Sequence, residues 1–577
     1  MIKTYLTKNL TNTCIAIILI GSVFLNFSHH NWLRKDRVIS WDVKSYYAYL
    51  PATFIYKDLS LQFRKDNMAK FGDLIWPVET PTNKQAIVTT MGLSILYAPF
   101  FGIAHGYCLI SEHQADGYSM PYKFTLVFSS LFYVIWGLIF LKKILQKYFD
   151  ENIVAFVVTA IGIGTNLFHY YTYRAPMPHA YNFALITLFI YKTIEFYENP
   201  SKKKIFWLGL LSGLIVLIRP TNIIILILFF LWNISSFKDL KTRITYFLKD
   251  YKLILIMFLG YILIWIPQFT YWYWISGKLF YFSYGELGGK FFFLNPQIKN
   301  VLISYKKGWF VYTPIMFFAC MGIFTLPKHN KGLFLPIIVF TILNIYIISS
   351  WWCWWYGGSF GQRALIDSYG LMAIPLASFL QWSKSKKITK YLSFVLIGIL
   401  IIFNIFQIQQ FKRQAIHYWW MNKESYWETF LKLDPTERYW EVITIPDYEK
   451  AREGIYVEIK PNRKKKEIKT NLPSKEKIIT FIIDEIKNDS IEYLNIENEA
   501  TSLNIEVDSL LNKTAEIKYR TYSTKDIKEL IIENLVKSIS DNKVLLKQVE
   551  EKAQNRNISL DSMLILDAIW LYENNKY

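Results

Sequence analysis

The chain has 577 residues, of which 53% are hydrophobic and 18% aromatic, and its formal net charge at pH 7 is +20. The apolar residues fall in blocks of roughly 15–20, the length that crosses about 30 Å of hydrocarbon as a helix. Lysines gather between these blocks and in the C-terminal tail, which is typical of membrane loops and excludes a nucleic-acid partner. The pattern therefore predicts an all-α polytopic membrane protein in contact with membrane lipids, not a soluble multidomain protein.

The N-terminal apolar run, Cys14–Phe27, follows Lys3 and Lys8 and precedes no small-x-small cleavage site. We therefore expect an uncleaved first span over 11–27, with the N-terminus in the cytoplasm. A long outer loop with juxtamembrane helices should follow over 28–121. Its apolar stretch 91–110 is interrupted by proline and glycine, and is expected to be a half-buried helix at the outer surface.

The positive-inside rule predicts about eleven transmembrane helices, because each short lysine cluster then lies on the cytoplasmic side. The expected spans are 11–27, 123–141, 153–170, 180–197, 205–219, 221–234, 253–268, 309–326, 333–350, 364–381 and 391–408. An odd number of spans places everything after the last one on the outer (periplasmic) face of the cytoplasmic membrane. We expect a transmembrane domain over 1–410, an aromatic membrane-proximal segment over 411–460, a linker over 461–475 and a soluble, mainly helical outer domain over 476–577.

An acidic residue, Asp42, lies in the first outer loop within the sequence Ser40–Pro51. A carboxylate fixed just outside the bilayer could accept a proton from an attacking hydroxyl. Aspartate also commonly caps the helix that follows it, and position alone favours this role for Asp42. Asp116 raises the same question, since it could be a second active-site acid or an aspartate of the turn before Gly117.

Several basic residues fall where an anionic group could bind. Arg174 and His179 lie in the predicted outer loop Tyr173–His179, which contains no acidic residue. An arginine in such a loop can hold a phosphate by paired hydrogen bonds. Arg219 lies between two apolar blocks, where a charge is costly unless it faces a polar cavity or reaches the headgroups. Arg363 could face the same cavity, or could pair with Asp367 four residues later.

The aromatic segment Trp351–Arg363 contains four tryptophans and three glycines. Trp354 and Trp355 could stack on a sugar, and Gln362 could donate or accept hydrogen bonds, whereas an interfacial aromatic belt would need no glycines. Glu286, in the glycine-rich segment Tyr284–Lys290, is a further acidic candidate.

These features together resemble the GT-C superfamily of membrane glycosyltransferases, such as the aminoarabinose and protein O-mannosyl transferases. The resemblance covers roughly 1–410 and lies in the first-loop acid, the Tyr/Pro-bearing surface segment at 97–101 and the alternating spans with an outer tail. The usual Pro-Pro-Leu signature is replaced here by Ala98-Pro99-Phe100-Phe101. In that superfamily the first-loop aspartate is the catalytic base, and its match is Asp42.

The resemblance implies a hexosyl- or pentosyltransferase of cell-envelope glycan biosynthesis that uses a polyprenyl-phosphate sugar as donor. The acceptor would be a glycan, a glycolipid or a protein, and the transfer would invert the anomeric carbon. Four isolated cysteines and the lack of Walker, GxSxG and HExxH motifs give no reason to expect a metal or another cofactor. The alternatives are a polysaccharide ligase or polymerase, and a membrane transporter or flippase.

Overall fold

A computed structural model describes residues 9–34, 37–460, 474–503, 505–522, 524–556 and 559–573. The chain forms two compact units, Met1–Pro461 and Asn462–Tyr577. The predicted linker 461–475 falls at this division, and its residues 461–473 lie outside the described ones.

The first half of the first unit contains the elements of the predicted outer loop 28–121. Its elements are α2 (Leu10–His29), η1 (Asn31–Leu33), α3 (Asp42–Phe54), α4 (Gln62–Asp66), α5 (Met68–Phe71), β1 (Pro77–Glu79), β2 (Gln85–Ile87), α6 (Gly92–Leu109), α7 (Met120–Leu145), α8 (Glu151–Ile163), α9 (Leu167–Tyr171), α10 (Pro178–Glu198), α11 (Lys202–Ile218), η2 (Pro220–Ile224), α12 (Ile225–Leu231) and α13 (Phe237–Lys249). Strands β1 and β2 form an antiparallel hairpin within the long first loop.

The second half is helical apart from the short antiparallel pair β3–β4. Its elements are α14 (Tyr251–Ser276), α15 (Ser283–Glu286), α16 (Ile298–Ile303), α17 (Trp309–Tyr312), α18 (Ile315–Ile323), α19 (Leu326–His329), η3 (Lys331–Leu333), α20 (Phe334–Ser350), η4 (Arg363–Ser368), α21 (Tyr369–Ser383), α22 (Lys387–Lys412), α23 (Lys423–Glu428), α24 (Glu437–Val442), β3 (Ile445–Pro446), α25 (Tyr448–Arg452) and β4 (Glu458–Ile459).

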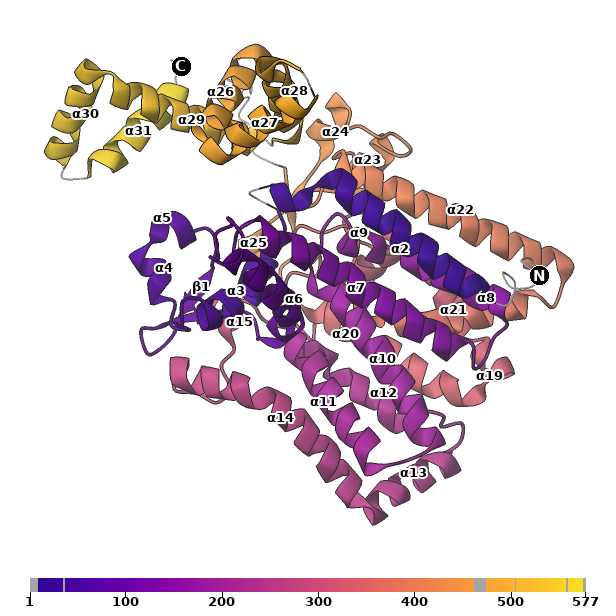
Figure 1. The fold of residues 1–577 in the computed structure, drawn as a ribbon. Coiled ribbons are helices and arrows are strands. Elements are labelled where there is room, and N and C mark those ends of the chain that lie inside the picture. The colour runs from indigo at the N-terminus through magenta and orange to yellow at the C-terminus, as the bar shows by residue number, and fades with distance from the viewer. Residues whose placement is uncertain are drawn as a thin grey trace. The chain divides into compact units, whose positions relative to one another are not determined.

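Seven helical segments of the described chain are long and apolar enough to cross a membrane. They include α2, α6, α7, α14, α20, α21 with its leading turn η4, and α22. Figure 1 shows α2 beside α7, and α8 packs against α2, α7 and α22. The prediction of a helical multi-pass membrane protein is confirmed, while the number eleven stays a prediction.

Two predicted spans are interrupted in the structure. The predicted span 153–170 is divided, because α8 ends at Ile163 and α9 begins only at Leu167. The predicted span 309–326 is likewise divided between α17 and α18, which Thr313 and Pro314 separate. A proline has no backbone N–H to continue the preceding helix, which explains the second break.

The apolar stretch that the sequence placed at the outer surface forms one continuous helix of 18 residues, α6, in spite of Pro99. Its length and composition also allow it to cross a membrane, so the surface position stays a prediction. Helix α6 packs on α3, α7 and α11. Its first residue, Gly92, lies against the backbone of Leu217 and Ile218, so α6 begins beside the end of α11.

Helix α21 is the most buried of the seven and packs against α7, α8, α10 and α18. The turn η4 leads directly into it, so residues of η4 lie at one end of the most enclosed helix of this unit. This position brings η4 close to the ends of α10 and α20.

Helices α11 and α14 approach each other closely through glycine. A Cβ at Gly213 would lie 2.7 Å from the Tyr261 carbonyl oxygen, and one at Gly260 would lie 2.5 Å from that of Phe206. A Cβ at Gly209 would collide with the Met257 carbonyl oxygen. Small residues four apart let membrane helices pack backbone to backbone, and here they fix the helix that ends just before Arg219.

Gly209→Ala should therefore destabilise the protein, because the added methyl group overlaps the backbone of α14. Overpacking of this kind typically costs ~1–3 kcal/mol. The measurement is thermal unfolding of the purified protein in nanodiscs. Gly398→Ala is the matched control, because no atom lies within 4 Å of a Cβ at that position of α22. Equal melting temperatures for the two variants would contradict the close approach of α11 and α14.

The second unit contains six helices among its described residues: α26 (Lys475–Asn488), α27 (Ser490–Leu503), α28 (Val507–Thr521), α29 (Thr524–Asp541), α30 (Lys543–Arg556) and α31 (Leu560–Glu573). Ile478, Ile482 and Ile486 lie on one buried face of α26, at the spacing of a helix.

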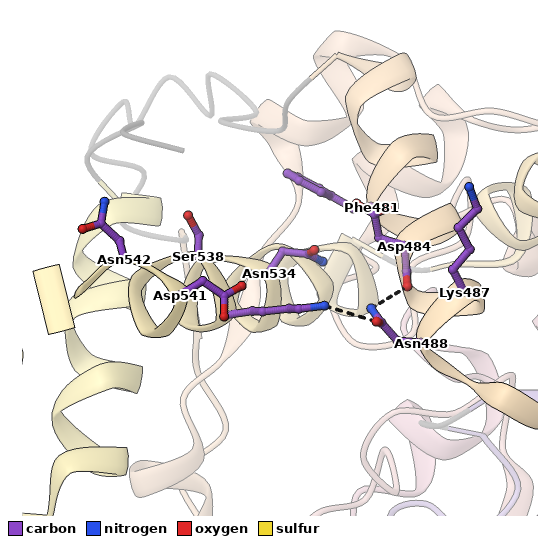
Figure 2. Close-up of a pocket in the computed structure, with 9 residues that line it drawn as sticks. Phe481, Asp484, Lys487, Asn488, Asn534, Ser538, Asp541 and Asn542 are labelled. Atoms are coloured by element: carbon purple, nitrogen blue, oxygen red, sulfur yellow. Dashed lines mark hydrogen bonds between the residues drawn. The ribbon is translucent and has the colours of Figure 1, made fainter. Parts of the chain in front are cut away.

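An open groove of about 680 Å³ lies between α26 and α29 in this unit. Lys537 of α29 reaches Asn488 of α26, where its Nζ donates to Oδ1 at 3.2 Å. Figure 2 shows side chains of both helices at this groove, among them Asn488 of α26 and Asn534 of α29. The groove is lined by Phe481, Asp484, Lys487, Asn488, Asn534, Lys537, Ser538, Asp541 and Asn542. This surface is mainly polar and carries charges of both signs.

The predicted orientation of the chain can be tested with a reporter that is active only in the cytoplasm. Fusion after Lys384, in a lysine-rich connection, should give a signal because that connection is expected inside. Fusion after Tyr577 should be silent, because eleven spans place the end of the chain outside. A signal from the Tyr577 fusion would change the number of spans by one and reverse the side of the later loops.

Candidate functional site

Asp42 is the first residue of α3, and its carboxylate faces an arginine. The Asp42 Oδ2 atom lies 2.8 Å from Nη2 of Arg363. Trp41 occupies the capping position of α3, and no side-chain hydrogen bond caps this helix. A capping carboxylate would accept from backbone N–H groups of the first turn, whereas this one is held by a guanidinium. The side chain of Asp42 is 40% exposed, so it stays accessible to a substrate.

A second acid, Asp367, is almost fully buried and accepts four hydrogen bonds. Its Oδ1 atom lies 2.9 Å from Nδ1 of His179. Its Oδ2 atom accepts from Nη1 of Arg219 at 2.9 Å, from Nδ2 of Asn222 at 2.9 Å and from Nδ2 of Asn182 at 3.0 Å. A buried carboxylate is tolerated when a cation and hydrogen-bond donors satisfy it, and this network provides both.

The sequence left open a pairing of Arg363 with Asp367, and the structure pairs each with another residue. Arg363 binds Asp42, and Asp367 binds Arg219. Arg363 and Asp367 belong to η4, which is a 3-10 helix. Residues four apart share a face of an α-helix, but with three residues per turn they point in different directions. The turn η4 therefore presents its two charges to two different partners.

Three tyrosines lie near the two ion pairs, of which Tyr46 is buried and Tyr284 and Tyr356 are half-buried. Burial raises the pKa of Tyr46, and the Asp42 carboxylate raises it further. Burial also raises the pKa of Tyr284, with further contributions from Tyr46 and Asp42. The pKa of Tyr356 is raised by burial and lowered by Arg219, whose Cζ lies 5.9 Å from its ring centroid. The three phenols stay protonated, so they can donate hydrogen bonds to a bound substrate.

Arg174 lies in the loop after α9 and lines a small pocket together with Arg37, Ser40 and Val43. Burial and the positive charge of Arg37 lower the pKa of Arg174, and Arg363 also contributes to this shift. Over the part of the chain that the structure describes, no hydrogen bond or ion pair occupies the Arg174 guanidinium. A partly enclosed guanidinium beside other cations is suited to binding an anion.

Asp116 forms part of the turn before α7. Its Oδ1 atom accepts from the backbone N–H groups of Tyr118 at 2.8 Å and Ser119 at 2.9 Å. Its other carboxylate oxygen pairs with Lys70 at 3.1 Å. These contacts correspond to the turn role of an aspartate, and both oxygens already have partners.

The predicted aromatic residues are enclosed by protein. Trp354 and Trp355 are both buried, and the Trp355 indole donates to the Tyr448 hydroxyl at 3.1 Å. The Gln362 amide donates to the Trp354 carbonyl oxygen at 2.9 Å, so it shapes the loop from within. Neither tryptophan offers an open ring face to a sugar. The side chain of Glu286 lies outside the described residues.

The structure also places residues at the site that the sequence did not single out. Asn182 and Asn222 both donate to Asp367. Asn182 lies one helical turn after His179, and Asn222 lies three residues after Arg219. Their spacing from His179 and Arg219 could have identified both asparagines from the sequence. A side-chain amide among apolar residues of a membrane protein needs a polar partner, and a residue three positions away is close enough to share one.

No family model matches the chain, and no curated protein matches it. Among solved structures, it is similar to the archaeal oligosaccharyltransferase AglB from Archaeoglobus fulgidus in complex with an inhibitory peptide and a dolichol-phosphate. That likeness covers 75% of this chain and 60% of the other, at 11% identity and a TM-score of 0.44.

Two further structures of the Archaeoglobus fulgidus oligosaccharyltransferase are similar to the chain. The apo form matches over 80% of this chain and 62% of the other, at 12% identity and a TM-score of 0.44. The form tethered with an acceptor peptide containing the NVT sequon matches over 80% and 61%, at 12% identity and a TM-score of 0.41. The chain thus spans about three fifths of the length of these structures.

The buried network predicts a strong coupling between Arg219 and Asp367. Arg219→Ala should cost ~3–5 kcal/mol of stability, because it leaves a buried carboxylate without its cation. Adding Asp367→Asn should restore part of this loss, since the uncompensated charge is then gone. The measurement is a double-mutant cycle by thermal unfolding in nanodiscs.

Arg413→Ala is the control for this cycle, because Arg413 pairs with Asp434 at an exposed position. Its melting temperature should equal that of the parent protein. Additive effects of Arg219→Ala and Asp367→Asn would show that the two side chains do not depend on each other.

Proposed function

We propose that this chain is a GT-C-type glycosyltransferase that moves a sugar from a polyprenyl-phosphate carrier to an acceptor at the outer face of the cytoplasmic membrane. The observation that carries this proposal is the geometry of Asp42. Its carboxylate is half-exposed, is held at 2.8 Å by Arg363, and lies beside a buried polar network at the ends of apolar helices.

The position of the site supports chemistry on a lipid-linked substrate. Asp42 begins α3, Arg174 lies after α9 and Arg219 after α11, so all three are at ends of helices that belong to the membrane unit. A lipid carrier in the bilayer can present its phosphate at this level while its chain stays in the hydrocarbon. Charged residues at such helix ends are costly to maintain and usually serve a substrate or an ion.

In the proposed reaction, Asp42 accepts the proton of the acceptor hydroxyl as its oxygen attacks the anomeric carbon of the sugar. The bond between that carbon and the carrier phosphate breaks on the opposite side, so the configuration inverts. The electron pair of the broken bond leaves on the phosphate, where negative charge increases. Arg363 orients the carboxylate for this step through their ion pair.

The cation for the departing phosphate is best supplied by Arg174. Arg219 already binds Asp367, and breaking that pair would leave a buried charge. The Arg174 guanidinium has no hydrogen-bonding or ionic partner among the described residues, and Arg37 and Arg363 lie near enough to lower its pKa. A group of guanidinium ions around one position stabilises an anion as it forms.

A strain that lacks the gene provides the test. It should accumulate the unused lipid-linked sugar and should lack one sugar on an envelope glycoconjugate, both of which mass spectrometry resolves. Reintroduced Asp42→Asn should fold normally yet transfer ~10²–10⁴-fold more slowly, because an amide cannot take the proton. Asp42→Glu should recover little, since moving the carboxylate by ~1 Å can itself cost ~10²-fold.

Asp434→Asn is the matched control, because it removes the acid of another aspartate–arginine pair in the same unit. This variant should restore the parent glycan profile. If Asp42→Asn restored the profile equally well, Asp42 would not be the base. An unchanged profile in the deletion strain would remove the proposed activity altogether.

A further inference from the structure

Two exposed tryptophans and a third, half-buried one meet beside Asp42. Trp41 is 49% exposed and Trp76 is 40% exposed. The ring centroids of Trp41 and Trp76 are 5.8 Å apart, and those of Trp41 and Trp419 are 6.2 Å apart. The interplanar angles are 79° and 75°, so the rings form an open corner with Trp41 in the middle. We call these three residues the tryptophan corner.

The backbone at Trp41 is held in a conformation that favours glycine. Its φ is 52° and its ψ is −132°, in a region where a side chain makes unfavourable contacts. Burial does not account for this conformation, because half of the indole faces outward. Unfavourable backbone geometry at a residue next to a catalytic group is characteristic of functional sites.

The other two rings are fixed by neighbouring groups. Lys44 lies over the Trp76 ring, with its Nζ 4.7 Å from the centroid. The segment that carries Trp419 is tied to the aromatic loop by buried Lys307, whose Nζ donates to the carbonyl oxygens of Ser359 and Tyr418. Rings that are held before a ligand arrives lose little freedom on binding.

The chemistry of the tryptophan corner favours a saccharide over a cation. Flat indole faces pack well against the C–H surface of a sugar ring, while the sugar hydroxyls stay solvated or bonded at the edges. An aromatic corner can also bind an ammonium group, but Lys44 already places a positive charge on Trp76. A second cation at this position would be repelled.

We propose that the tryptophan corner is an acceptor subsite that binds a saccharide, so the acceptor of the transfer is a glycan. This inference rests on the proposed glycosyltransferase activity. Trp41 directly precedes Asp42, which places the tryptophan corner next to the proposed base in the chain. Binding at the corner then serves to orient the attacking hydroxyl, and the three rings act as positioning residues.

The deletion strain supplies both substrates for the experiment. Its lipid extract contains the unused donor, and its envelope contains the unmodified acceptor. Purified full-length protein in nanodiscs is assayed for transfer while each substrate is varied separately. The acceptor fraction is also pretreated with protease or with periodate, which destroys vicinal diols of sugars. Activity should survive the protease and be lost after periodate.

Trp41→Leu and Trp76→Leu should each raise the apparent KM for the acceptor about tenfold, which corresponds to ~1.4 kcal/mol of binding. The KM for the donor and the limiting rate should stay within about twofold, and Trp41→Phe should recover part of the acceptor affinity. Trp274→Leu is the matched control. Trp274 is also exposed, and Lys84 also lies over its ring, at 4.8 Å, but it belongs to α14. Its variant should keep the parent constants.

Three results would overturn the acceptor subsite while leaving the proposed function intact. The first is an unchanged acceptor KM in Trp41→Leu and Trp76→Leu. The second is an equal rise of the acceptor KM in Trp41→Leu, Trp76→Leu and the control Trp274→Leu. The third is an acceptor that protease destroys and periodate does not. Equal effects would identify the rings as membrane-interface anchors. Absence of any transfer by the parent protein would overturn the glycosyltransferase activity, and the subsite with it.

Discussion

The arrangement of the site depends on two ion pairs that share one short turn. Arg363 and Asp367 both belong to η4, and they bind Asp42 of α3 and Arg219 at the end of α11. Both members of the second pair are enclosed, and a charge that lost its partner there would have no water to replace it. The turn therefore links α3, the residues after α11 and α10 through charges that depend on one another.

Hydropathy alone was sufficient to predict the class of the protein. Apolar runs of helical length require internally bonded backbones, so the helices of the membrane unit follow from the physics of the bilayer. The same reasoning singled out Arg219 and Arg363, because charges next to apolar runs must find a polar environment. Asp42 could be identified as a candidate from its place in the outer loop.

Which side chains contact each other could not be predicted, because such contacts depend on local backbone geometry that hydropathy does not encode. The spacing of Arg363 and Asp367 suggested a pair on an α-helix, but η4 is a 3-10 helix and separates them. Trp354 and Trp355 were expected to contact sugar, yet residues such as Tyr448, nearly a hundred positions away, cover them. The helix breaks after Ile163 and at Pro314 also depend on local backbone conformation, which the mean hydropathy of a span does not show.

The buried amine of Lys307 bears on whether the residues after α22 belong structurally to the membrane unit. By bonding to Ser359 and to Tyr418, it joins a loop between membrane helices to the segment that follows α22. A Cβ at Gly358 would lie 3.1 Å from the Tyr418 ring and 3.2 Å from the Trp419 indole nitrogen, so the two segments also fit closely. The residues that follow α22 are thus packed into the membrane unit and are not an appendage to it. Exchange of this segment between related chains would succeed only if the aromatic loop were exchanged with it.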